Sequence, residues 1–194
     1  MSIPLSPITP GTANPNAALR TSFNGMCAII QEEAIVLRTY PDTKKVPTIG
    51  VGHTAAAGGI IPTPGLTITL LQAVQQFQKD LVRFETHVKN AIKFKLLQYQ
   101  FDALVSFDFN TGAIQSGSVD DFINAKKLGP AMDVLMHYEK AGGVVLQDLV
   151  HRRTHERDMF EHGVYPAVPY LQVFDSYPGK GKLVSVNTIR SQFN

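Results

Sequence analysis

Helical periodicity dominates this chain between residues 22 and 163. Apolar side chains recur every three or four positions in a segment that a Thr69-x-x-Gln72 capping box opens. The same spacing marks a segment from about Gln98 to Asn110, and Gly112 follows as a typical helix stop. The other expected helices are one that begins after Ser22, a short one after Ser118, one from Pro130 to Gly142-Gly143, and one over 148–162 before Gly163. The chain is therefore expected to be largely α-helical.

One stretch near the N-terminus has a strand pattern instead. Residues 37–51 combine strand-type side chains with turn-type residues at 41–44, which predicts a β-hairpin. We therefore expect a predominantly helical α+β fold with a small N-terminal β-hairpin and a helical C-terminal lobe.

The two ends of the chain are expected to flank a single domain over residues 21–163. Prolines punctuate residues 1–20, which predicts an irregular lead-in. Residues 164–194 also contain several prolines and few helical signals, which predicts an irregular C-terminal arm. A piece of this size has too little core to stand alone. We favour a tail packed over the domain, with a small appendage that binds a surface or a partner as the alternative.

Composition excludes several classes of protein. Of 194 residues, 44% are hydrophobic and 18% are charged, which is typical of a globular domain, and the net charge of +2 does not indicate a nucleic-acid binder. The single cysteine, Cys27, allows no disulfide within the chain and is expected to be a buried structural thiol. No window approaches 18 consecutive apolar residues, and the first 16 residues lack the basic start of a secretory signal. We expect synthesis in the cytosol, no signal peptide and no stable membrane insertion.

Two carboxylates near the predicted hairpin suggest a site. On a helical wheel Glu33 lies at the edge of the buried face of its helix, whereas Glu32 points to solvent. Glycoside hydrolysis needs one protonated and one ionised carboxyl group. A helix C-terminus and partial burial both disfavour the charged form of Glu33, so it suits the acid role, and Asp42 in a polar turn would stay ionised. Thr48, on the returning strand, could hold a water molecule. A chance arrangement of these residues is the alternative on spacing alone.

The pattern Glu33-x8-Asp42-x5-Thr48, followed by Ile-Gly-x-Gly-His-Thr, resembles the catalytic signature of the phage-type lysozymes, the glycoside hydrolase family 24 endolysins. Residues 96–112 and 138–163 resemble the central helix and the C-terminal helical signature of that family. The resemblance covers about residues 21–163. It implies a lysozyme-like fold and an N-acetylmuramidase that cleaves the β-1,4 bond between N-acetylmuramic acid and N-acetylglucosamine in peptidoglycan, as a monomer without a cofactor.

The resemblance also assigns roles to residues. It implies that Glu33 is the general acid, Asp42 the second carboxylate and Thr48 the residue that positions the attacking water of an inverting enzyme. Arg152 matches an arginine that pairs with the acid, and Arg153 is the alternative if the register shifts by one. The residues that match the lining of the sugar cleft are Thr54, Phe109 and Asn110; for Phe109, plain helix packing is the alternative reading.

The chain departs from the family pattern at four positions. Ala34 stands where a glycine usually follows the acid, and Lys45 stands at the usual turn glycine. Val51 and Tyr138 replace a tyrosine and a tryptophan. These departures remove no catalytic group, but they bear on substrate fit and rate.

Several alternatives stay open at this point. The fold could serve as a glycan-binding or assembly module without turnover, or as a wall-remodelling muramidase of a secretion or virion-entry system. If the protein is an endolysin, the expected release route is membrane permeabilisation by a holin. His151 and His155 have a spacing that can bind zinc, but no third ligand is evident, so no metal is expected. His53 is expected to be a structural hydrogen-bonding residue.

Overall fold

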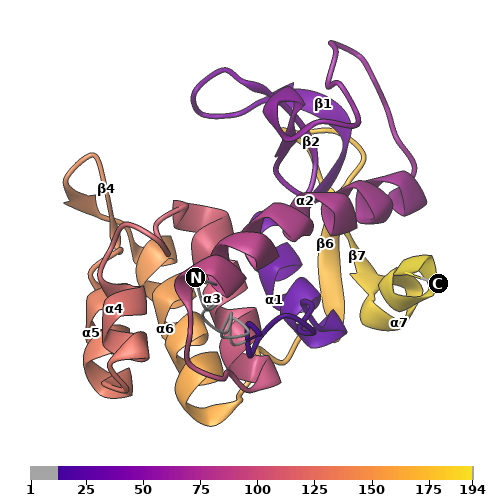
Figure 1. Ribbon diagram of the computed structural model, residues 1–194. Coiled ribbons are helices and arrows are strands. Elements are labelled where there is room, and N and C mark those ends of the chain that lie inside the picture. The colour runs from indigo at the N-terminus through magenta and orange to yellow at the C-terminus, as the bar shows by residue number, and fades with distance from the viewer. Residues whose placement is uncertain (1–12, 194) are drawn as a thin grey trace, which may run out of the picture.

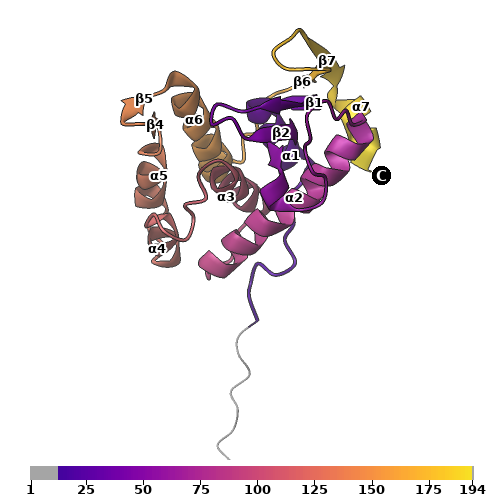
Figure 2. The ribbon, with the colours of Figure 1, turned by 90° about the horizontal axis from the view of Figure 1, so that it is seen from above.

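The computed structural model describes residues 13–193 as two lobes that share a long helix (Figure 1). The α-helices are α1 (Phe23–Glu33), α2 (Leu70–Ala91), α3 (Gln98–Thr111), α4 (Val119–Asn124), α5 (Leu128–Met136), α6 (Gln147–His162) and α7 (Val186–Arg190). The strands are β1 (Ile35–Pro41), β2 (Pro47–Gly50), β3 (His53–Thr54), β4 (Lys140–Ala141), β5 (Val144–Val145), β6 (Tyr170–Phe174) and β7 (Gly181–Ser185). Two short 3-10 helices, η1 (Ala55–Ala57) and η2 (Ser191–Phe193), complete the list. Figures 1 and 2 show α4, α5 and α6 at one end of the molecule and the larger sheet at the other.

The ends of the main helices follow from local sequence signals. Ser22 caps α1, and Thr69 and Gln72 form the reciprocal capping box that opens α2. Gly112 and Gly163 end α3 and α6 in the left-handed conformation that favours glycine. These expected helices are confirmed.

The centre of the molecule is α3. All nine residues from 100 to 108 are buried, and α3 packs against α2 on one side and α6 on the other. Cys27 in α1 is buried as expected, and burial raises the pKa of its thiol to about 11. The mostly helical α+β fold is confirmed.

The sheet is larger than the expected hairpin. The predicted β1–β2 hairpin forms, with Tyr40 opposite Thr48, but the sheet has five strands in the order β3-β2-β1-β6-β7. Strand β6 runs parallel to β1, which pairs residues 35 and 36 with residues 173 and 174. The expectation that residues 164–194 form an irregular arm is therefore wrong for this segment. The strand signal of β6 is an alternation of buried and exposed side chains over only five residues, which is easily missed between prolines.

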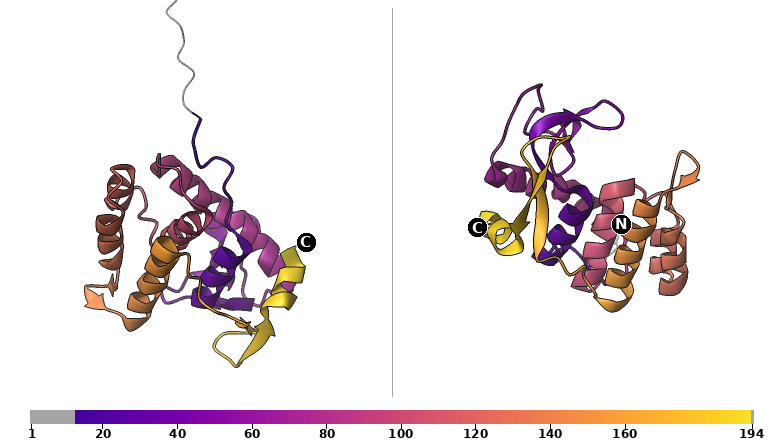
Figure 3. Two further views of the ribbon diagram at one scale, coloured as in Figure 1. Left: turned by 90° about the horizontal axis from the view of Figure 1, so that it is seen from below. Right: turned by 180° about the vertical axis from the view of Figure 1, so that it is seen from behind.

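The end of the arm is also part of the core. Leu171 and Val173 face inward from β6, and Ile189 in α7 is fully buried. The ring of Phe193 packs edge-on against Phe23, at 5.5 Å between centroids. Helix α7 and η2 lie beside α2 (Figure 3). The arm covers the domain, but as ordered secondary structure.

A second correction concerns the helix expected from Pro130 to Gly142-Gly143. Helix α5 ends at Met136, and residues 140–145 form a two-stranded hairpin. Gly142 and Gly143 are its turn, with φ of 58° and 82°. A positive φ at both central residues is typical of the type I′ turn, one of the two that two-residue hairpins favour, so the glycine pair marks a turn and not a helix end.

The lead-in is described from residue 13 onward, and the expectation for residues 1–12 lies outside the described part. Residues 13–20 contain no helix or strand, yet they are tied to the domain. Asn16 is buried and donates to the carbonyl oxygens of Ile92 and Phe94, and its Oδ1 accepts from the backbone of Leu96. Over residues 13–193, no helix is both long and apolar enough to cross a membrane.

Candidate active site

Glu33 is the last residue of α1, at the point where the chain turns into β1. The turn is made by Ala34, with φ of 60° and ψ of 177°, a conformation that is nearly confined to glycine. The backbone N–H of Ala34 still donates to the carbonyl oxygen of Ile30, at 2.7 Å. Strain at Ala34 thus accompanies the abrupt change of direction that follows Glu33.

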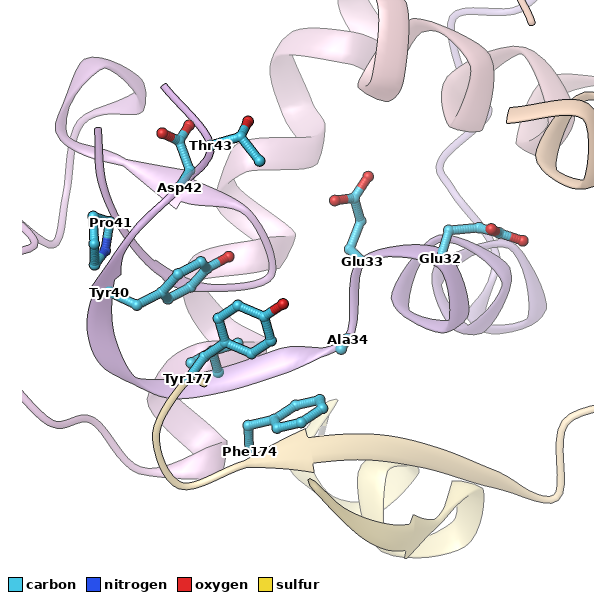
Figure 4. Close-up of a pocket in the computed structure, with 10 residues that line it drawn as sticks. Glu32, Glu33, Ala34, Tyr40, Pro41, Asp42, Thr43, Phe174 and Tyr177 are labelled. Atoms are coloured by element: carbon cyan, nitrogen blue, oxygen red, sulfur yellow. The ribbon is translucent and has the colours of Figure 1, made fainter. Parts of the chain in front are cut away.

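The two glutamates at this helix end face different surroundings. The side chain of Glu33 is 24% exposed and that of Glu32 is 19% exposed, so the expectation that Glu32 is the solvated one is wrong. Helix α6 covers the side chain of Glu32, and His155 Nδ1 on that helix lies 3.0 Å from Glu32 Oε1. In Figure 4 the carboxylate of Glu32 points away from Asp42. Glu32 and Glu33 are therefore similarly buried, and they differ in the direction in which their carboxylates point.

Arg152 is the arginine that contacts Glu33. Its Nη1 donates to Glu33 Oε1 at 2.6 Å. Arg153, the neighbour in sequence, instead donates from Nη2 to Asn110 Oδ1 at 3.0 Å, and its Nε lies 2.8 Å from Glu156 Oε2. Of these two arginines on α6, Arg152 is the one that contacts Glu33.

Glu156 joins these contacts into one buried network. It is 1% exposed, and its Oε1 accepts from Ser106 Oγ at 2.8 Å and lies 3.4 Å from Arg152 Nε. Burial raises the pKa of Glu156, although the two arginines oppose this shift. Sequence reasoning missed Glu156. Its spacing of three and four residues from the two arginines, on one helix, was the available signal.

The charge state of Arg152 follows from its neighbours. Burial alone would lower the pKa of Arg152, but the carboxylates of Glu33 and Glu156 outweigh burial and raise this pKa above its ordinary value. Arg152 therefore stays charged.

The hairpin turn orients Asp42 by local bonds. Asp42 Oδ1 accepts from the backbone N–H groups of Lys44 and Val46, both at 2.8 Å. Lys45 adopts a positive φ of 65° in this turn. Thr48 is buried on β2, and its Oγ1 donates to the carbonyl oxygen of Val46 at 3.0 Å. The hydroxyl proton of Thr48 is thus already used, and its oxygen lone pairs remain available to accept a hydrogen bond.

Glu33 and Asp42 line one cavity of about 560 Å³. Figure 4 shows them on two sides of it, with the aromatic rings of Tyr40 and Tyr177 between. The complete lining is Glu32, Glu33, Ala34, Val36, Tyr40, Pro41, Asp42, Thr43, Phe174 and Tyr177. The other expected site residues, Thr48, Thr54, Phe109, Asn110 and Arg152, do not line this cavity.

Contacts place two of those other residues. Thr54 on β3 pairs with Thr48 across the sheet. Phe109 is half-buried against Phe84, with 4.8 Å between ring centroids. A Cβ on Gly52 would lie 3.7 Å from Glu33 Oε2 and 3.8 Å from Phe109 Cε1, so that loop brings Phe109 near the acid. Phe109 therefore both packs in the core and borders the site.

The histidines have other partners. His53 is buried, with Nδ1 2.8 Å from Asp80 Oδ2 and Nε2 2.7 Å from the carbonyl oxygen of Ile60. These contacts suit the structural role expected for His53. Within residues 13–193, no cluster of three or more histidine, cysteine or acidic side chains could hold a metal ion.

Comparison with known proteins agrees with this geometry. The phage lysozyme family matches residues 30–156. The endolysin of Salmonella phage P22 is 34% identical over 147 residues, which cover 73% of this chain and 98% of that protein. The endolysin of Bacillus phage PZA is 35% identical over 75% of this chain and 56% of its own length. The solved endolysin from Escherichia coli O157:H7 phage FAHEc1 has a TM-score of 0.71 at 31% identity, over 77% of this chain and 98% of its own. The chain therefore belongs to the phage lysozyme family and is a glycoside hydrolase.

Proposed function

We propose that this protein is an endolysin-type N-acetylmuramidase that hydrolyses the β-1,4 bond between N-acetylmuramic acid and N-acetylglucosamine with inversion. The observation that carries the proposal is the placement of Glu33, which is paired with a buried Arg152 and faces Asp42 across one cavity. A water molecule between the two carboxyl groups is what an inverting mechanism requires.

The proposed roles follow from the hydrogen bonds. Protonated Glu33 gives its proton to the glycosidic oxygen as the bond to the anomeric carbon breaks. Asp42 Oδ1 is occupied by two backbone N–H groups, which leaves Oδ2 to accept a proton from the attacking water. Thr48 accepts the other hydrogen bond of that water, because its own proton is directed to Val46. The water then attacks the face of the sugar opposite Glu33.

The biological setting is proposed with the chemistry. The protein acts as a monomer on peptidoglycan glycan strands, without a metal or cofactor, and reaches the wall from the cytoplasm when the membrane is permeabilised. Family membership supports peptidoglycan as the substrate.

The first test compares two neighbouring glutamates. Glu33→Gln is expected to abolish lysis of chloroform-treated Gram-negative cells and hydrolysis of purified peptidoglycan while the circular dichroism spectrum is unchanged. Glu32→Gln is the matched control and is expected to stay active. An active Glu33→Gln enzyme would remove Glu33 from the acid role. Wild-type protein that binds peptidoglycan without cleaving it would instead favour a glycan-binding module.

The second test concerns stereochemistry. Proton NMR of the fresh product is expected to show the α-anomer first. Thr48→Glu is expected to cripple this route, because its carboxylate would occupy the place of the water. A β-anomer from the wild-type enzyme would contradict the water-positioning role of Thr48.

A further inference from the structure

The C-terminal arm, residues 164–193, reaches the catalytic cavity. The phage lysozyme match ends at residue 156, yet Phe174 and Tyr177 from this arm line the same cavity as Glu33 and Asp42. In Figure 4 their rings lie on the wall formed by β1 and the end of β6. The arm thus adds surface to the site beyond the matched part of the chain.

Strand pairing fixes this added wall relative to the acid. Val36 in β1 pairs with Phe174 in β6, and Val36 is only three residues beyond Glu33. Leu171 and Val173 anchor β6 in the core. Phe174 is therefore held at a set position beside the end of α1.

Three aromatic rings form the wall. Tyr177 lies 5.3 Å from Tyr40 and 5.7 Å from Phe174 between ring centroids. Tyr177 is 53% exposed, so a large part of its side chain is accessible to a ligand. Aromatic faces beside a few polar groups suit a pyranose ring, whose C–H face is apolar and whose rim carries hydroxyl and acetamido groups.

We propose that Tyr177 and Phe174, together with Tyr40, form an additional saccharide subsite that binds one N-acetylhexosamine ring of the glycan strand next to the catalytic carboxylates. This inference rests on the proposed function, because it extends the same cavity. Tyr177 is the principal stacking residue, since it is the most exposed of the three rings.

A sugar fits this wall better than a peptide stem of peptidoglycan does. Among residues 13–193, the cavity is lined by no lysine or arginine that could bind peptide carboxylates. Strand β1 pairs with β2 along one side. Along the other side, residues 35 and 36 pair with β6, and residues 37 and 39 bond to residues 68 and 66, so little free edge is left for an extended peptide. The occupant is therefore assigned as a carbohydrate ring.

The test measures binding in an inactive Glu33→Gln background. Oligomers of N-acetylglucosamine with two to six rings are titrated by calorimetry. Tyr177→Ala is expected to weaken binding of the longest oligomer about tenfold and that of the disaccharide less. The matched control is Tyr170→Ala on the same arm, because Tyr170 is 54% exposed and does not line the cavity. Equal melting temperatures of the two variants would show that any difference is local. An unchanged Kd in Tyr177→Ala, or an equal loss in Tyr170→Ala, would overturn the subsite.

Two further measurements distinguish a failure of the proposed subsite from a failure of the proposed muramidase function. The first compares hydrolysis of glycan strands by the wild-type enzyme and by a Tyr177→Ala variant that keeps Glu33. The variant is expected to have a raised KM and a nearly unchanged kcat. Absent hydrolysis with intact length-dependent binding would sink the proposed function and leave the subsite standing. If Tyr177→Ala weakens binding only of strands that carry peptide stems, the site recognises peptide and the carbohydrate assignment is wrong.

Discussion

The two sides of the active site are built in different ways. Glu33 is held by Arg152, a residue 119 positions away in sequence, which in turn lies against the buried Glu156. Asp42 is held by backbone N–H groups two and four residues away, in an exposed turn. One carboxylate therefore depends on the packing of α6 against α3, and the other depends on a hairpin turn that its own side chain stabilises.

The two carboxylates should therefore differ in how strongly changes around them affect the stability of the fold. A change in the buried network should reach the whole fold, because it leaves charges without partners in the interior. A change in the turn should stay local, because water can replace the lost bonds. The following predictions test this contrast, from the largest expected effect to the smallest.

The largest effect is expected at the centre of the network. Glu156→Ala should lower the free energy of unfolding by about 3–5 kcal/mol, because the fully buried Arg153 loses its carboxylate partner. Urea denaturation measures the change. Glu161→Ala on the same helix is the control, since its pair with Arg157 is partly exposed and should contribute less than about 1 kcal/mol. Similar losses in the two variants would show that the buried network stabilises the fold no more than a surface ion pair does.

Removal of Arg152 should lower the rate of hydrolysis. Arg152 Nη1 donates to Glu33 Oε1 at 2.6 Å, so without it the carboxyl group of Glu33 loses its fixed orientation. Arg152→Ala should therefore lower kcat on purified peptidoglycan by about 10- to 100-fold, measured at a temperature where the variant stays folded. Arg157→Ala, on the exposed side of α6, should leave kcat nearly unchanged. An unchanged kcat in Arg152→Ala would contradict a positioning role for this pair.

Relief of backbone strain should change the free energy of unfolding less than Glu156→Ala does, and in the stabilising direction. Ala34→Gly should raise the free energy of unfolding by about 1 kcal/mol, because strain of about 1–3 kcal/mol at this φ and ψ exceeds the entropic cost of glycine, roughly 0.5–1 kcal/mol. Gln31→Gly in the same helix should instead lose about 1 kcal/mol. Thermal melting compares the two. A destabilised Ala34→Gly protein would mean that Ala34 is not strained.

The smallest effect on stability is expected in the turn. Asp42→Asn should leave the free energy of unfolding within about 0.5 kcal/mol, since the amide Oδ1 can accept the same two bonds. Asp42→Ala should lose about 1 kcal/mol. Both variants should lose most hydrolytic activity, because neither has the carboxylate that we propose as the acceptor of the proton from water. Full activity in Asp42→Asn would remove Asp42 from the chemistry.

Local signals made much of the fold predictable from sequence. The cap at Ser22, the box at Thr69, and the glycines that end α3 and α6 act through bonds to near neighbours, so the residues themselves contain the information. The hairpin that carries Asp42 and Thr48 is equally local. The position of Glu33 at a helix end, and its resemblance to a catalytic signature, required no knowledge of packing.

The remaining features depend on contacts between distant parts of the chain. The pairing of β1 with β6, which turns the arm into a wall of the cavity, joins residues more than 130 positions apart. The choice of Arg152 over Arg153 as the partner of Glu33 depends on how α6 faces α1, and the burial of Glu32 has the same cause. Sequence alone thus determined the main helices and the hairpin, and it located the candidate catalytic groups within them. Only the tertiary structure decided which charges pair and what closes the site, because those contacts form when separate elements pack together.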